Sequence, residues 1–297
     1  MGGNAFPGLA MVRVRREDVA STVDHVVMAM AMPGFTREYA MSNLMGSAGK
    51  QADSGDLDFA LNNKVARFYG EPDLPVFSLR AFAERARQVL PLGHVQTKTL
   101  KGGQFQTAFP VAGDPSKGYV QVDFVAGNPE WLKFSHFSPG KDFSPYKGVM
   151  VSTMMGVLAK MHKDYELLDD QGERYARVGL RYDLERGLYR QWKLRKREGN
   201  GLSVVTADEF ETAVPGSPRF TRLSHVTVPE EVLHLLFKHP VKPDEVDTFE
   251  KLVSKVRQLL PDRFDEARER FLEAFMRSAG KNDYSLDQVA SDKVWLE

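Results

Sequence analysis

The spacing of apolar residues predicts two amphipathic helices near the N-terminus. One begins near Glu17 and ends with the run VVMAMAMPG, where Pro33 and Gly34 stop it. The other covers Leu79–Leu90, where apolar side chains recur at i, i+3, i+4 and i+7, with Ser78 in a capping position and Pro91 after the last turn. Each segment has one apolar stripe, as expected of a helix packed on a core.

Alternation with a period of two predicts strands between and after these helices. Residues 103–126 are predicted to form a β-hairpin around the turn sequence GDPSKG. In its second strand Val120, Val122 and Phe124 share one face, which places the carboxylate of Asp123 on the other. An acid inside a strand is unusual enough to require a reason.

The C-terminal half has a different pattern. A Met-rich helix is predicted over Tyr146–Met161 and strand-like runs over Tyr165–Arg197, and the methionines are expected to fill gaps in the core. Three further helices are predicted at Pro229–Lys238, Thr248–Leu260 and Pro261–Ser278. We therefore expect an α+β fold with a soft boundary near residue 164, giving a catalytic domain (1–164) and a mixed, largely helical domain (165–297).

Composition removes several classes of protein. The chain of 297 residues has 40 basic and 40 acidic residues, so any nucleic-acid or membrane contact would need a local patch. Without cysteine there are no disulfides, thiolate nucleophiles or Cys-type zinc sites, and an intracellular, cytoplasmic location is expected. No apolar run approaches the roughly 20 residues of a membrane helix, and no signal peptide is recognisable.

The candidate chemistry lies in the sequence MGSAGKQADSGDLDFAL, residues 45–61. Asp56 and Asp58 would share one face of a strand, where two carboxylates repel each other unless a cation such as Mg²⁺ lies between them. Asp123 would add a third acid and allow a second metal ion. The small turn before the acids would bring backbone amides, the Ser47 hydroxyl and the Lys50 ammonium group to a triphosphate.

These residues resemble the nucleotidyltransferase superfamily typified by DNA polymerase β. The shared pattern is Gly46-Ser47, a spacer of eight residues, Asp56-Leu57-Asp58 and a later strand acid, Asp123. The surrounding sequence is similar to nucleotidyltransferase-like proteins of bacteriophages, over roughly residues 17–135. The resemblance implies a small mixed β-sheet flanked by helices, metal ligands at Asp56, Asp58 and Asp123, and phosphate binding at Gly46 and Ser47.

The implied activity is a Mg²⁺- or Mn²⁺-dependent transfer of a nucleoside monophosphate from an NTP, such as ATP, to a hydroxyl group, with release of pyrophosphate. Asp123 would also help to deprotonate that hydroxyl. An RNA 3′ end, such as that of a tRNA, is the favoured acceptor because the basic sequence LYRQWKLRKR contains Trp192 for stacking. A protein hydroxyl and a small molecule remain open, and a phage-encoded protein would act in the host cytoplasm.

Other interpretations remain beside this one. The fold can serve a non-catalytic nucleotide- or nucleic-acid-binding regulator, and clustered carboxylates also occur in metal-dependent nucleases. A P-loop is disfavoured because Leu44 and Gln51 occupy its first glycine and its hydroxyl positions. Trp131, His136 and Phe137 suit either a base pocket or the core. The N-terminal GGNAF suits either a tail or a loop over the site.

Overall fold

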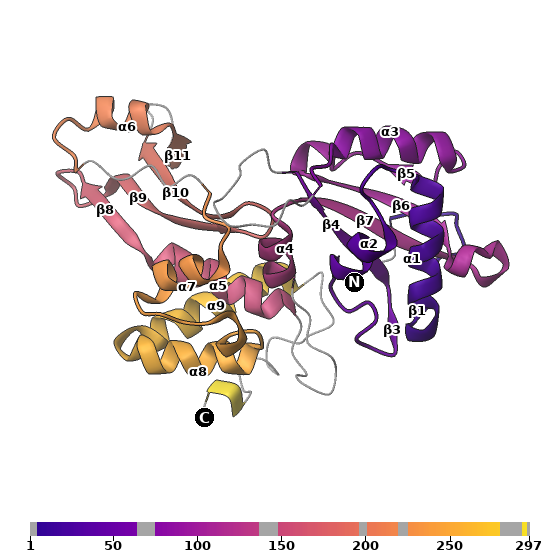
Figure 1. Ribbon diagram of the computed structural model, residues 1–297. Helices are drawn as coiled ribbons and strands as arrows, with labels where there is room; N and C mark the ends of the chain where they lie inside the picture. The colour runs from indigo at the N-terminus through magenta and orange to yellow at the C-terminus, as the bar shows by residue number, and fades with distance from the viewer. Residues whose placement is uncertain are drawn as a thin grey trace. The chain divides into compact units, whose positions relative to one another are not determined.

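The chain folds as a mixed α+β protein with several separate sheets (Figure 1). The computed structural model describes residues 5–63, 75–136, 148–195, 201–218, 225–279 and 293–295. The contacts divide the chain into two compact units, Met1–Gly148 and Val149–Glu297. The division lies at the start of helix α5 (Gly148–Met161), not after it as the sequence suggested. Helix α5 joins the second unit because Arg177 and Arg263 donate hydrogen bonds to the carbonyls of its last two residues.

The first unit is built on a five-stranded sheet in the order β2-β4-β7-β6-β5. These strands are β2 (Leu44–Met45), β4 (Asp56–Asn62), β5 (Val95–Gln96), β6 (Gln104–Pro110) and β7 (Tyr119–Gly127). Strands β4 and β7 are parallel, and the other neighbours are antiparallel. The pairing of β6 with β7 confirms the predicted hairpin. A separate ribbon pairs β1 (Val14–Arg15) with β3 (Asp53–Ser54).

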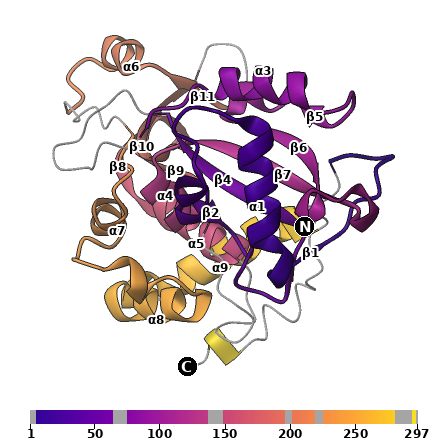
Figure 2. The same cartoon turned by 45° about the vertical axis from the view of Figure 1, so that its right-hand side comes forward.

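Helices α1 (Arg16–Met30) and α3 (Leu79–Val89) pack on one face of this sheet (Figure 2). Their apolar stripes meet strand residues in a single core that includes Val23, Val26, Phe82, Leu57, Phe59, Val122 and Phe124. The Ser78 hydroxyl accepts a hydrogen bond from the backbone N–H of Ala81, which confirms the predicted cap. The remaining helical segments are α2 (Arg37–Ser42), α4 (Pro129–Ser135) and the 3₁₀ turn η1 (Leu100–Gly102).

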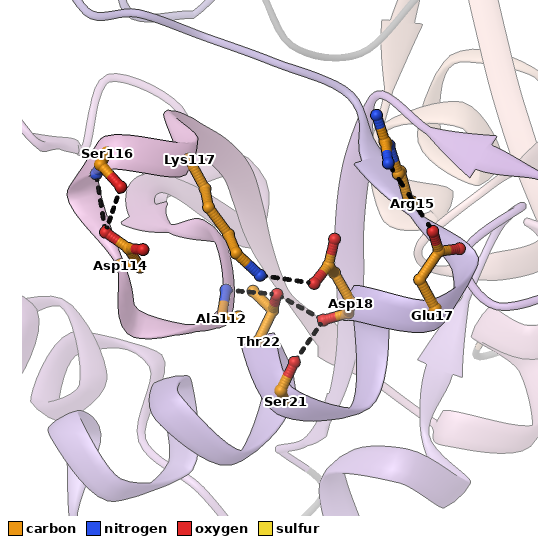
Figure 3. Close-up of polar contacts among 9 residues, drawn as sticks. All are labelled: Arg15, Glu17, Asp18, Ser21, Thr22, Ala112, Asp114, Ser116 and Lys117. Atoms are coloured by element: carbon orange, nitrogen blue, oxygen red, sulfur yellow. Dashed lines mark hydrogen bonds and ion pairs between the residues drawn. The ribbon is translucent and has the colours of Figure 1, made fainter.

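The predicted GDPSKG turn is longer than a simple hairpin turn and is fastened to α1. It contains two 3₁₀ turns, η2 (Val111–Gly113) and η3 (Pro115–Lys117). The Thr22 hydroxyl accepts a hydrogen bond from the N–H of Ala112 at 2.9 Å, and Lys117 forms an ion pair with Asp18 at 2.9 Å (Figure 3). These contacts fix the start of β7, the strand that carries Asp123, relative to the helix layer.

The second unit contains a four-stranded antiparallel sheet in the order β11-β10-β9-β8. Its strands are β8 (Lys163–Leu168), β9 (Arg174–Asp183), β10 (Gly187–Arg195) and β11 (Leu202–Val205). Helix α6 (Ala207–Ala213) covers one face, where Phe210 packs with Ala176 and Val178. The ambiguous sequence GLYRQWKLRKR is therefore a strand as far as Arg195, and its last two residues lie outside the described residues.

The other helices of the second unit are α5, α7 (Pro229–Phe237), α8 (Phe249–Leu259) and α9 (Phe264–Ala279), with 3₁₀ turns η4 (Pro243–Glu245), η5 (Pro261–Arg263) and η6 (Lys293–Trp295). The helix predicted from Pro261 begins at Phe264 because the first three residues form η5. Phe249, Phe271 and Trp295 form an aromatic cluster. None of the helices in the described residues combines the length and the apolarity needed to cross a membrane.

Candidate metal and nucleotide site

Three aspartates lie together on the sheet face that points away from α1 and α3. In the parallel pairing of β4 with β7, Asp58 lies opposite Asp123, and Asp56 precedes Asp58 by two residues on the same face. The intervening Leu57 and its neighbour Val122 are fully buried in the helix-covered core. The alternation of β4 and β7 therefore directs apolar side chains to the helices and carboxylates to the opposite face.

Asp123 is buried, Asp56 and Asp58 are partly buried, and the charge of Arg13 lowers the pKa of Asp56 against the effect of burial. Burial raises the pKa of Asp58 well above its ordinary value, and the charges of Asp56 and Asp123 raise it further. Burial also raises the pKa of Asp56, and it raises the pKa of Asp123 to about 6. None of the ion pairs within the described ranges involves any of the three. Such a cluster favours a bound cation, which would remove the repulsion.

A row of glutamines continues this polar face across the sheet. Asp123 lies opposite Gln106 on β6, and Gln106 lies opposite Gln96 on β5. The Gln121 amide donates a hydrogen bond of 2.9 Å to the Asp123 carboxylate, and hydrogen bonds from Gln121 and Gln106 lower the pKa of Asp123 against the effect of burial. The sequence analysis missed these glutamines. Their signal was the alternation of polar residues in QFQTAF and VQVDF.

The small turn before the acids lies against Asp58. Gly46 has a φ of 66°, and a Cβ at this position would lie 3.0 Å from the Asp58 carboxylate oxygen Oδ2. Glycine is therefore favoured here both by the backbone conformation and by the close approach of the carboxylate. The Ser47 hydroxyl lies 2.7 Å from that of Ser54, and the carbonyl of Ser47 accepts hydrogen bonds from the next turn. Lys50 is exposed at the end of the turn, and burial of part of its side chain lowers its pKa.

The N-terminal segment lies beside the acid face. The N–H of Ala5 donates a hydrogen bond of 3.2 Å to Gln121, and the Gln96 amide donates to the carbonyl of Ala5. Residues 1–4 of the GGNAF sequence lie outside the described residues. Ala5 is therefore held by two of the glutamines on the sheet face that carries Asp123, and Phe6 after it is buried.

The donor set suits a hard divalent cation. Carboxylate oxygens are the ligands that Mg²⁺ prefers, and three aspartates share one face of the paired strands β4 and β7. Within the described residues no group of three or more acidic or histidine side chains has already closed to metal-binding distances. Asp56, Asp58 and Asp123 would hold one metal ion or two, as the sequence predicts.

Two other predicted features differ in outcome: Trp192 has different surroundings from those expected, and the segment of Trp131 and His136 has those of one of its two alternatives. Trp192 packs toward the core of the second sheet, with Ala176 and Val178, so its ring is not placed among the basic side chains of its strand. Trp131 is fully buried and His136 is bonded to the carbonyl of Leu132, as expected of the core alternative for this segment. Phe137 lies outside the described residues.

Comparison with protein-family models and with curated proteins gave no match.

Proposed function

We propose that this protein is a metal-dependent nucleotidyltransferase whose site is the acid face of the first sheet. The observation that carries the proposal is the register of β4 with β7, which sets Asp58 opposite Asp123 and places both carboxylates, with Asp56, on one face of the sheet, where burial raises the pKa of each. Grouped carboxylates with raised pKa values are typical of functional sites, and carboxylate oxygens are ligands that Mg²⁺ prefers.

In this proposal Asp56 and Asp58 hold Mg²⁺, or Mn²⁺, and Asp123 completes the site. The bound ions would neutralise the triphosphate and stabilise the leaving pyrophosphate. Asp123, which lies opposite Asp58, would accept the proton of the attacking hydroxyl. Gly46 leaves space beside Asp58 for phosphate oxygens, and the Ser47 hydroxyl and Lys50 are the nearest groups in sequence to bind them.

The acceptor in this proposal is a hydroxyl group, with an RNA 3′ end such as that of a tRNA as the first choice. A protein side chain and a small molecule are the other acceptors to test. ATP is the first donor to test, followed by the other NTPs. The same acid cluster also suits a regulatory protein that binds a metal-nucleotide complex without turnover, so the experiment has to separate binding from transfer.

The test uses each α-labelled NTP with Mg²⁺ and either total RNA or cell lysate. We compare the wild type with Asp56→Asn/Asp58→Asn and with the control Asp24→Asn, which changes an exposed acid on α1. Label should enter a product with the wild type and the control and fall by at least about 10³-fold with the double variant. Mg²⁺-dependent NTP binding without any transfer would support the regulatory protein, and equal labelling by the double variant would exclude this site.

A further inference from the structure

A second charged face, of opposite sign, lies on the sheet of the second unit. Arg177 lies opposite Lys193 across β9 and β10, and Arg181 follows on the same face of β9. The other face of these strands carries Ala176, Val178 and Trp192 toward α6. The strands are therefore amphipathic, with an apolar face under α6 and a basic face on the other side.

The basic face closes into a small pocket with residues from two helices. Lys160 at the end of α5 and Arg270 of α9 line it together with Arg177, Arg181 and Lys193. We call these five residues the basic pocket. Its volume is about 150 Å³, and none of the described residues that line it is acidic. Gly179 lies between the two strand arginines, where a Cβ would come within 2.6 Å of the His162 carbonyl oxygen, so the middle of the pocket carries no side chain.

The basic pocket is less compensated than its surroundings. Neighbouring basic residues on the same sheet are paired, Arg190 with Asp164 at 2.8 Å and Arg195 with Asp169 at 3.1 Å. In the pocket Arg270 pairs with Glu266, and Arg177 donates to the carbonyl of Lys160. Among the ion pairs of the described residues, none involves the other three members, which are Lys160, Arg181 and Lys193.

The electrostatics show the cost of this arrangement. The pKa of Lys160 and that of Lys193 are both lowered, first by burial and then by nearby cations that include Arg181. Burial lowers the pKa of Arg177 as well, with Arg174 and Arg270 adding to the effect. An anion in the pocket would relieve this repulsion, as a cation would on the acid face.

The size of the pocket indicates which anion fits. A volume of about 150 Å³ is below the 300–1,000 Å³ typical of sites for whole small molecules, and it suits one phosphate group. A wider hollow of about 490 Å³ adjoins it and shares Lys160 and Arg181. Thr153, Tyr182, Asp183 and Glu185 also line this hollow, so its acids lie away from the basic pocket's phosphate position and leave the hollow to the uncharged nucleoside.

We propose that the basic pocket binds a backbone phosphate of single-stranded RNA, with the adjoining hollow receiving the attached nucleoside. Arginine and lysine side chains form charge-assisted hydrogen bonds with phosphate oxygens. We favour single-stranded RNA as the occupant because the pocket fits a phosphate and the adjoining hollow fits a nucleoside, which together form the repeating unit of an RNA chain. This binding does not require the acids of the first unit and goes beyond the proposed transfer reaction.

The test measures binding of a labelled single-stranded RNA of about 12 nucleotides by fluorescence anisotropy at several salt concentrations. The pocket variant is Arg181→Gln/Lys193→Gln. The control, Arg80→Gln/Lys251→Gln, removes the same charge from residues outside the pocket and the hollow that pair with Glu84 and Asp247. We expect the pocket variant to bind at least ten-fold more weakly and the slope of log K against log salt to fall by about 1.4, whereas the control binds as the wild type.

Further arms separate the alternatives. Thermal melting followed by circular dichroism checks that each variant folds, and the single substitution Lys160→Gln at an exposed position replaces the double variant if it does not. Asp56→Asn/Asp58→Asn should retain RNA binding, so loss of transfer and loss of binding are distinguishable. Equal RNA binding by the pocket variant and the wild type overturns the proposal. So does a wild type that binds only inorganic phosphate or phosphatidylserine vesicles.

Discussion

The two large sheets of this protein present opposite charges in the same way. In each, one face is apolar and packs against one or more helices, and the other gathers side chains with charge of one sign. The acid face of β4 and β7 holds Asp56, Asp58 and Asp123, and the basic face of β9 and β10 holds Arg177, Arg181 and Lys193. The difference is that the acids come from two adjacent strands alone, whereas the basic pocket also needs residues from α5 and α9.

The two faces also differ in how burial changes the pKa values of their side chains. On the acid face, burial makes the carboxylates hold protons more tightly than usual. On the basic face, the long side chains reach toward solvent and their pKa values change in the opposite direction. On both faces, burial therefore opposes the ionised form of the side chains.

The largest expected effect tests the apolar side of the first sheet. Phe124 is fully buried and stacks on Phe105 with ring centroids 5.0 Å apart. Phe124→Ala should lower the free energy of unfolding by about 3–5 kcal/mol, because it removes a large side chain from a tightly packed core. Chemical denaturation measures it. A loss below 1 kcal/mol would mean that this face is not the core that supports the acids.

The second prediction is a gain in the free energy of unfolding, and it concerns Asp123, the residue before Phe124. The pKa of Asp123 rises from 3.8 to about 6 on folding, which corresponds to about 3 kcal/mol of destabilisation at pH 7. Asp123→Asn should therefore stabilise the protein at pH 7 in metal-free buffer. Because the folded carboxyl binds its proton more tightly, this gain should disappear as the pH falls from about 6 to below 4.

The wild type and Asp123→Asn also test the proposed metal site. Mg²⁺ should raise the melting temperature of the wild type and have a smaller effect on Asp123→Asn, since the variant has lost one of the three carboxylates. A scan with and without Mg²⁺ at pH 7 measures this. If the ion stabilises both proteins equally, the acids do not bind it together.

A smaller effect is expected at the turn beside Asp58. Gly46→Ala should cost about 1–2 kcal/mol, because the backbone has a positive φ and the new methyl group would meet the Asp58 carboxylate. Gly93→Ala is the matched control, since Gly93 also has a positive φ and its Cβ would meet no atom within 4 Å. Gly46→Ala should lose more unfolding free energy than Gly93→Ala, and the difference measures the contact with Asp58. Equal losses at both positions would leave only the backbone effect.

The smallest effect is expected on the basic face. Arg181 is exposed, and Arg181→Gln should change the free energy of unfolding by no more than about 0.5 kcal/mol in either direction. Inorganic phosphate should raise the melting temperature of the wild type more than that of the variant, because one of the cations that would bind it is missing. A similar phosphate response in both proteins would place the anion elsewhere.

Local patterns were sufficient for most elements of secondary structure. Helix α1 with its stop before Pro33, the Ser78 cap of α3 and the pairing of β6 with β7 were all predictable, because each depends on residues close in sequence. The connection between β6 and β7 and the start of α9 were not, since the first is fixed by Thr22 and Lys117 and the second by the 3₁₀ turn η5. The division at the start of α5 also depended on contacts from distant residues.

The sequence by itself determined that Asp56 and Asp58 share a face and that Asp123 points away from Val122, because alternation along a strand is a local property. Tertiary structure decided that β4 lies parallel to β7 with Asp58 opposite Asp123, and that Gln106 and Gln121 stand beside them. It also decided that Trp192 faces the apolar core and that the basic pocket is formed by residues of α5, β9, β10 and α9. Strand register and helix packing join residues far apart in the chain, and no local pattern encodes those distances.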